Sequence, residues 1–183
     1  MKLKVTTKET QLGKALKKLH NEGNVSFKVG VFGENDSKMV KIAATHEFGA
    51  NIEVKENRFV SKLGRIVKQG TIIKIPARRW LSLAFTRNEK FYKELIKTNL
   101  KKIAEGKMSV EKSNDIIAIT LASRTKAELG KDMPPPLKYR NGTPLVDNGD
   151  LRRSIGTKVV TNKGVSETKK YGDDQWKHSG ILI

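Results

Sequence analysis

Apolar residues recur along this chain with two different periods, and these periods divide it into helices and strands. Spacings of three and four residues predict helices over 11–20, 37–48, 79–105 and 109–129. Alternation of apolar with polar residues predicts strands over 25–31 and 156–160. The pattern therefore predicts an α+β fold. We expect the two long helices after Pro76 to form an antiparallel pair that covers the sheet.

The same periodicity predicts which side chains enter the core. In the helix over 37–48 we expect Val40, Ala43, Ala44 and Phe48 on the inner face, and Gly49 at the end of the helix. In the two long helices the expected inner residues are Leu81, Ala84, Phe91, Leu95 and Ile103, followed by Val110, Ile117, Leu121 and Leu129.

Residues 50–74 combine β-branched residues with many positive charges. Ile52 and Val54 alternate with polar residues, and residues 71–75 form another strand-like run. The charges argue against a buried position for this segment; they are Lys55, Arg58, Lys62, Arg65 and Lys68. A projecting β-hairpin arm satisfies both features, because apolar residues can then meet a neighbour while charged ones face solvent.

The stretch Ile75–Leu81, which reads IPARRWL, joins this arm to the first long helix. Pro76 favours an extended residue before it and suits the first turn of a helix. We expect two other stretches to fold back toward this junction, namely ATHEFG (Ala44–Gly49) and PLVDNGDLRRSI (Pro144–Ile155).

Four arginines lie in these stretches: Arg78, Arg79, Arg152 and Arg153. A planar guanidinium can bind phosphate or a carboxylate through two hydrogen bonds, and it can equally be a solvated surface group. Both readings stay open. In the last stretch Asp147 is the expected N-cap of a short helix over 148–154, with Asp150 three residues later. We expect residues 1–160 to form one domain, and residues 161–183 to be a polar C-terminal extension.

The chain has 183 residues and a formal net charge of +18. This charge favours an anionic partner, with nucleic acid first. The lysines are scattered along the whole chain, so a lysine-rich solvated surface explains the charge equally well. No apolar run reaches the length of a membrane span, and the first residues lack the apolar core of a signal peptide. We therefore expect a protein made in the cytoplasm that does not contact a membrane.

Candidate catalytic and metal sites are incomplete. The chain has no cysteine, and Ala50 stands where a zinc protease motif starting at His46-Glu47 needs its second histidine. Residues 30–33 (GVFG) lack the ending of a phosphate loop. Asp147 and Asp150 suit a helix start better than a catalytic pair. These residues predict a protein that is not an enzyme and needs neither metal nor cofactor.

Three stretches in order resemble the tail-completion proteins of tailed bacteriophages, which are also called virion morphogenesis or head–tail joining proteins. That family shows a helix ending in HEFG or HEYG, then IPARPFL, then a late D-T-G-x-L-x-x-S-I. Ala43–Gly49 matches the first motif. Ile75–Leu81 matches the second, with Arg79 where proline is usual and Trp80 where phenylalanine is usual. Leu145–Ile155 matches the third, with Asn148 in place of threonine.

The resemblance implies a curved antiparallel sheet with helices packed on one face and a variable arm between the first two motifs. It implies a structural, non-enzymatic virion protein, assembled in the host cytoplasm as a ring, with six subunits expected. Its partners would be tail tube, sheath and neck or connector proteins, and DNA would pass through the lumen.

The expected contact residues are Arg58, Arg65, Pro76, Arg78, Arg79, Trp80, Arg152 and Arg153. The alternative is a basic nucleic-acid-binding protein, whose DNA affinity would fall steeply with salt. A small hydrolase is a third reading, and the incomplete catalytic sites argue against it.

Overall fold

The computed structural model describes residues 10–22, 24–34, 37–60, 64–129, 131, 133–137, 145 and 149–171. It is an α+β protein with antiparallel sheets, as the sequence predicts. Its helices are α1 (Gln11–Glu22), α2 (Ser37–Phe48), α3 (Trp80–Ala104), α4 (Val110–Glu128) and α5 (Asp150–Ser154). Its strands are β1 (Ser26–Val31), β2 (Ala50–Glu53), β3 (Arg58–Val60), β4 (Arg65–Val67), β5 (Ile72–Ile75), β6 (Ile155–Thr161), β7 (Gly164–Val165) and β8 (Lys169–Lys170).

The main sheet is centred on β6. On one side β6 pairs with β1 in antiparallel register, from Ser26 opposite Val160 to Val31 opposite Ile155. It also pairs with the short strands β7 and β8. Residues 164–170 therefore belong to the sheet, although their polarity had suggested a surface extension that begins at Thr161.

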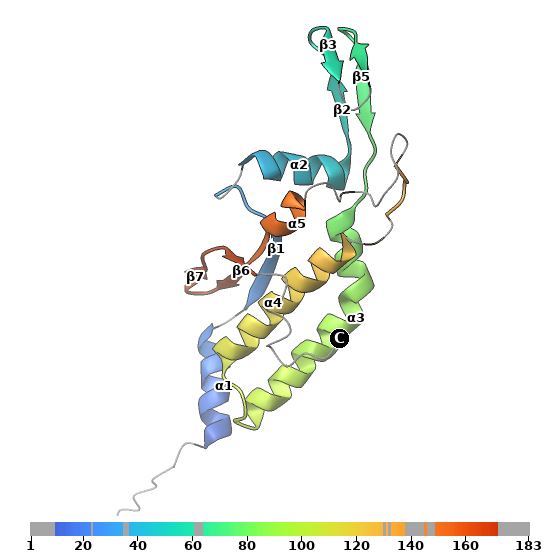
Figure 1. Cartoon of the computed structure of the whole chain (residues 1–183). Helices are drawn as coiled ribbons and strands as arrows, with labels where there is room; N and C mark the ends of the chain where they lie inside the picture. The colour runs from blue at the N-terminus through green and yellow to red at the C-terminus, as the bar shows by residue number, and fades with distance from the viewer. Residues whose placement is uncertain are drawn as a thin grey trace, which may run out of the picture.

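The long helices α3 and α4 form the predicted antiparallel pair beside this sheet (Figure 1). Ser109 caps α4, because its side-chain oxygen accepts a hydrogen bond from the Lys112 N–H at 3.2 Å. Tyr92 of α3 packs with Ile117 and Leu121 of α4, and Phe27 and Val29 of β1 pack against this cluster. This cluster holds the helix pair on the sheet.

A second core cluster joins α2, α5 and the start of α3. Its buried members are Met39, Ala43, Trp80, Leu129, Met133, Leu151 and Ile155. The predictions that Ala44 and Phe48 face this core are wrong, because both residues are exposed, Phe48 to 79%. The inner face of α2 consists of Met39, Ala43 and Glu47, which are spaced four residues apart. Phe48 follows Glu47 directly and therefore points about 100° away from that face.

Residues 50–75 form two antiparallel ladders in succession, β2 with β5 and β3 with β4. We call these residues the arm. In Figure 1 the arm extends away from the helices. Among its described residues Val54 and Val67 are buried, and Val54 also exchanges backbone hydrogen bonds with Thr71 and Gly70. No described arm residue belongs to either core cluster, so this part of the arm is packed separately from the body.

No helix within the described ranges is long and apolar enough to cross a lipid bilayer.

Candidate functional site

The first turn of α3 is capped by a side chain from another helix. Arg79 at the N-cap position has φ 28° and makes no side-chain cap. The buried carboxylate of Glu47 lies there instead. Its Oε2 accepts from the Leu81 N–H at 2.8 Å, and its Oε1 accepts from the Ser82 N–H at 3.2 Å and from the Ser82 hydroxyl. A carboxylate suits this place because it binds unpaired N–H groups at the positive end of the helix dipole.

Residues 78–80, at the start of α3 and directly before it, donate hydrogen bonds to the last carbonyls of α2. The Arg78 N–H donates to the His46 carbonyl at 2.8 Å, and the Arg79 N–H donates to the Glu47 carbonyl at 3.3 Å. The indole Nε1–H of Trp80 donates to the Ala43 carbonyl at 3.2 Å. We call residues 43–49 and 75–82 the joint. Each half of the joint satisfies terminal backbone groups of the other.

The helix α3 begins at Trp80, one residue after the predicted start, so Pro76 lies before the helix and not in its first turn. Residues 76–79 are instead the connection that bonds to the end of α2. The resembled motif usually has proline at the position of Arg79. A proline could not adopt the φ of 28° that Arg79 has here.

Gly49 allows the two halves of the joint to approach. Its φ is 76°, and a Cβ at this position would lie 2.9 Å from both the Ala77 nitrogen and the Ile75 oxygen. Only glycine avoids both the strained φ and these contacts. Ala50 pairs with Ile75 directly beyond this point, so the arm is rooted in the joint.

The third matched stretch packs into the core cluster beside the joint. Leu151 and Ile155 belong to the cluster that contains Ala43 and Trp80. The helix α5 begins at Asp150, later than predicted, and Gly149 occupies its N-cap position with φ 80°. The predicted cap Asp147, like Asn148, lies outside the described residues. As predicted, all three stretches converge on one part of the fold.

Arg78 is buried in the joint rather than available at the surface. Its exposure is 7%, and its Nε–H donates to the Pro135 carbonyl at 3.2 Å. Burial, helped by the positive charge of Arg78, lowers the pKa of His46. The Nδ1 atom of His46 is buried without a hydrogen-bond partner among the described residues.

The predicted contact residues divide into two groups. The side chains of Arg78 and Trp80 are buried and hold this chain's own fold together. The others are exposed: Pro76 and Arg79 beside the joint, Arg152 and Arg153 on α5, and Arg58 and Arg65 on the arm. Arg153 also bonds Asp150 at 2.6 Å on its own helix.

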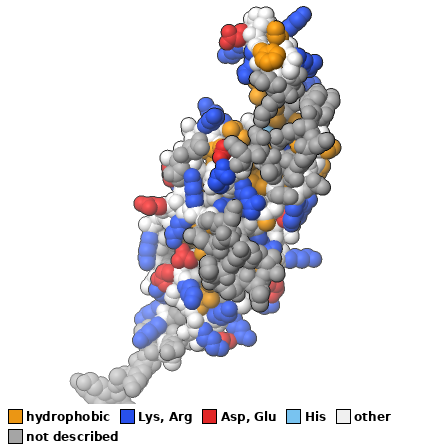
Figure 2. All heavy atoms as spheres, viewed as in Figure 1, with side chains coloured by type: hydrophobic (Ala, Val, Ile, Leu, Met, Phe, Trp, Pro, Cys, Tyr) orange, Lys and Arg blue, Asp and Glu red, His pale blue; other side chains and the backbone are white. Residues whose placement is uncertain are grey.

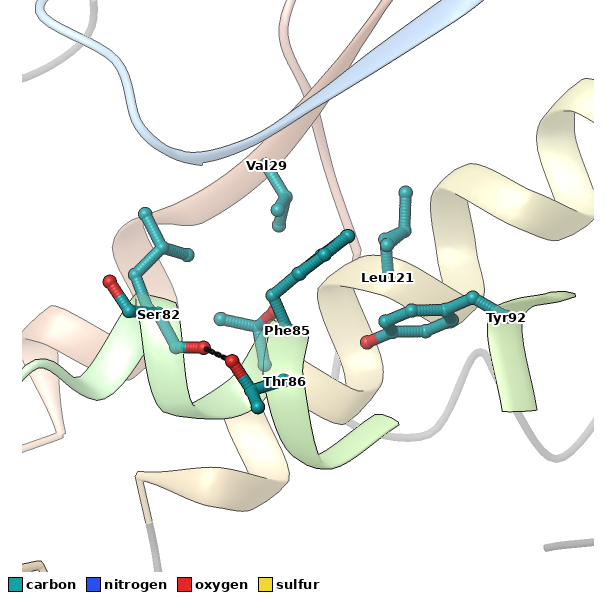
Figure 3. A pocket seen from close by; sticks show the side chains of 8 residues that line it. Val29, Ser82, Phe85, Thr86, Tyr92 and Leu121 are labelled. Carbon is teal, nitrogen blue, oxygen red and sulfur yellow. Dashed lines mark hydrogen bonds between the residues drawn. The ribbon is translucent and has the colours of Figure 1, made fainter. Parts of the chain in front are cut away.

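A hollow of about 380 Å³ lies between β1 and the helices α3 and α4 (Figure 3). Its apolar lining comes from Val29, Leu81, Phe85 and Leu121. Tyr92 also lines it. Burial raises the pKa of Tyr92 to about 12, so its phenol is protonated at neutral pH. The buried phenol oxygen has no hydrogen-bond partner within the described part of the chain.

Sequence reasoning missed both Glu47 and this hollow. The usual N-cap signal lies directly before a helix, whereas Glu47 precedes Leu81 by 34 residues. The hollow is lined by three elements far apart in the chain and has no local signal. The described residues contain no group of three histidine, aspartate or glutamate side chains that could hold a metal ion.

Comparisons with models of protein families, with curated proteins and with solved structures found no match to this chain. The family resemblance therefore rests on the three stretches and on their arrangement.

Proposed function

We propose that this chain is a structural protein of a tailed-bacteriophage virion that completes the tail and joins it to the head or neck as a ring of identical subunits. The observation that carries the proposal is the joint. Each of the three stretches that resemble the tail-completion proteins contributes residues to the joint or to the core cluster beside it. Glu47 caps α3, Gly49 allows the close approach, and Trp80 and Leu151 fill the shared core.

The arm gives this protein a surface suited to assembly. Phe59 and Ile66 are directly opposite each other in the β3–β4 ladder, and their side chains are 63% and 65% exposed. Ile52 and Ile73 form a second such pair at 46% and 36%. Paired apolar side chains on an exposed ladder mark an interaction site. We assign them to contacts with neighbouring subunits or tail proteins.

The basic surface supports a nucleic-acid-binding protein as the second candidate. The net charge is +18, and Figure 2 shows lysine and arginine spread over the visible face from the arm to α1. Such a surface would line the lumen of a ring through which DNA passes, or would bind DNA as a free subunit. The exposed apolar pairs favour the ring, because binding to phosphates needs charge rather than apolar surface.

Deleting the arm tests the proposal. Residues Asn51–Gly70 are replaced with a short glycine linker, and the variant complements a phage that lacks the protein. We expect a folded variant, because neither core cluster contains an arm residue, and no incorporation into tails. Electron microscopy with a labelled full-length protein should place the label where tail meets head.

A milder variant, Phe59→Asp with Ile66→Asp, keeps the arm and should also fail to enter tails. The matched control, Lys55→Ala with Glu56→Ala, changes exposed arm residues of no apolar character and should assemble normally. Infectious particles that carry the arm-deleted protein contradict the role of the arm in assembly. A label that lies away from the place where head and tail meet contradicts the proposal.

A further inference from the structure

The hollow beside Tyr92 and the tip of the arm are complementary in chemistry. The hollow has an apolar wall and opens beside Phe85, whose side chain is 56% exposed. The arm tip presents Phe59 and Ile66 side by side on one face of its ladder. An engineered cavity of about 150 Å³ holds benzene, so a hollow of 380 Å³ can accept a phenyl ring together with a branched aliphatic side chain.

The arm tip cannot enter the hollow of its own copy. Leu81 and Ser82 line the hollow and belong to the joint in which the arm is rooted. Phe59 follows Ala50 by nine residues, which places the tip about 30 Å from the joint along the ladder. Figure 1 shows the arm pointing away from α3 and α4.

We infer that the arm tip of one copy inserts Phe59 and Ile66 into the hollow between β1, α3 and α4 of the next copy. The ring of Tyr92 forms part of the wall that receives these two side chains, while its phenol oxygen stays buried behind that wall.

The contact uses two different surfaces of the same chain, so it is heterologous. Each copy offers an arm to one neighbour and a hollow to the other, and repetition closes a ring if the rotation between copies allows it. The inference rests on the ring of the proposed function, and it specifies which surfaces form that ring.

The absence of cysteine permits a direct test with purified protein. One preparation carries Lys68→Cys, at an exposed arm residue two positions from Ile66, so that Phe59 and Ile66 stay in place. A second carries Thr86→Cys, at an exposed residue that lines the hollow. Mixed under mild oxidation, they should form a disulfide-linked heterodimer. The control pairs Lys68→Cys with Lys97→Cys, which is exposed on the same helix beyond the hollow. Equal cross-linking in both mixtures, or none in the first, overturns the inference.

Thiol labelling of Thr86→Cys in dilute monomer is a second test. We expect rapid labelling, because Thr86 is exposed and lines the hollow. Slow labelling overturns the contact, since it shows that another part of the same copy covers the hollow.

These results are separable from those on the proposed function. Cross-linking together with a label away from the place where head and tail meet supports the contact and contradicts the role in tails. A label at that place without cross-linking retains the role in tails and removes this contact.

Discussion

At the scale of single residues, Glu47 is the side chain on which the joint depends most. Its carboxylate accepts from two backbone N–H groups and one hydroxyl of α3, and its exposure is only 6%. Glu47→Ala removes the acceptor of these part-buried donors, so we expect it to lower the free energy of unfolding by about 1–2 kcal/mol. Urea denaturation measures this loss.

The matched control is Glu56→Ala, because Glu56 is an exposed arm carboxylate and should change stability by less than about 0.5 kcal/mol. Glu47→Gln retains one acceptor oxygen and should fall between the two. If Glu47→Ala were as stable as the control, the capping role would be wrong.

Phe48 and Glu47 show why sequence patterns predict some residues and not others. Helical periodicity treats the apolar Phe48 as an inner residue and the charged Glu47 as an outer one. The structure reverses them, because the N–H groups of Leu81 and Ser82 require an acceptor and, among the described residues, Glu47 supplies it. That requirement arises 34 residues away and leaves no periodic signal near Glu47. The predicted inner residues of the second long helix, in contrast, are buried as expected, namely Val110, Ile117, Leu121 and Leu129. Polar residues buried beside them, such as Thr120, Thr125 and Lys126, do not follow from the apolar period.

At the scale of elements, Gly49 controls how closely α2 approaches the strand β5. Gly49→Ala introduces a Cβ 2.9 Å from two backbone atoms, at a φ of 76°. Gly70→Ala meets nothing within 4 Å at a nearly equal φ of 78°. Both variants carry the cost of a left-handed alanine, and only the first carries a backbone clash. We expect Gly49→Ala to lose about 1–3 kcal/mol more than Gly70→Ala in chemical denaturation. Equal losses of stability in the two variants would mean that the two halves of the joint can move apart at no further cost.

The elements themselves were largely predictable, since α3, α4, β1 and β6 each bury a face for several turns or residues. The strands β7 and β8 were not, because two residues cannot show a period of two. They are recruited by pairing with β6, and Gly156 leaves room for the Lys169 carbonyl that approaches it. The predicted start of α5 was too early, because the capping rule looks for aspartate at the N-cap position. In the structure Gly149 takes that position with a positive φ.

At the scale of the whole molecule, the net charge of +18 sets opposite salt dependences for the two candidate functions. Copies that associate through the arm repel one another, and the screening length falls from about 30 Å at 0.01 M salt to about 10 Å at 0.1 M. The ring therefore predicts self-association that strengthens as sodium chloride rises from 0.01 to 0.3 M, measured by sedimentation velocity. DNA binding must weaken over the same range, because the release of counterions from DNA gains less free energy as the salt concentration rises. The arm-deleted protein is the control and should stay monomeric throughout. A protein that remains monomeric at every salt concentration, while binding DNA tightly at low salt, would identify the nucleic-acid-binding function instead.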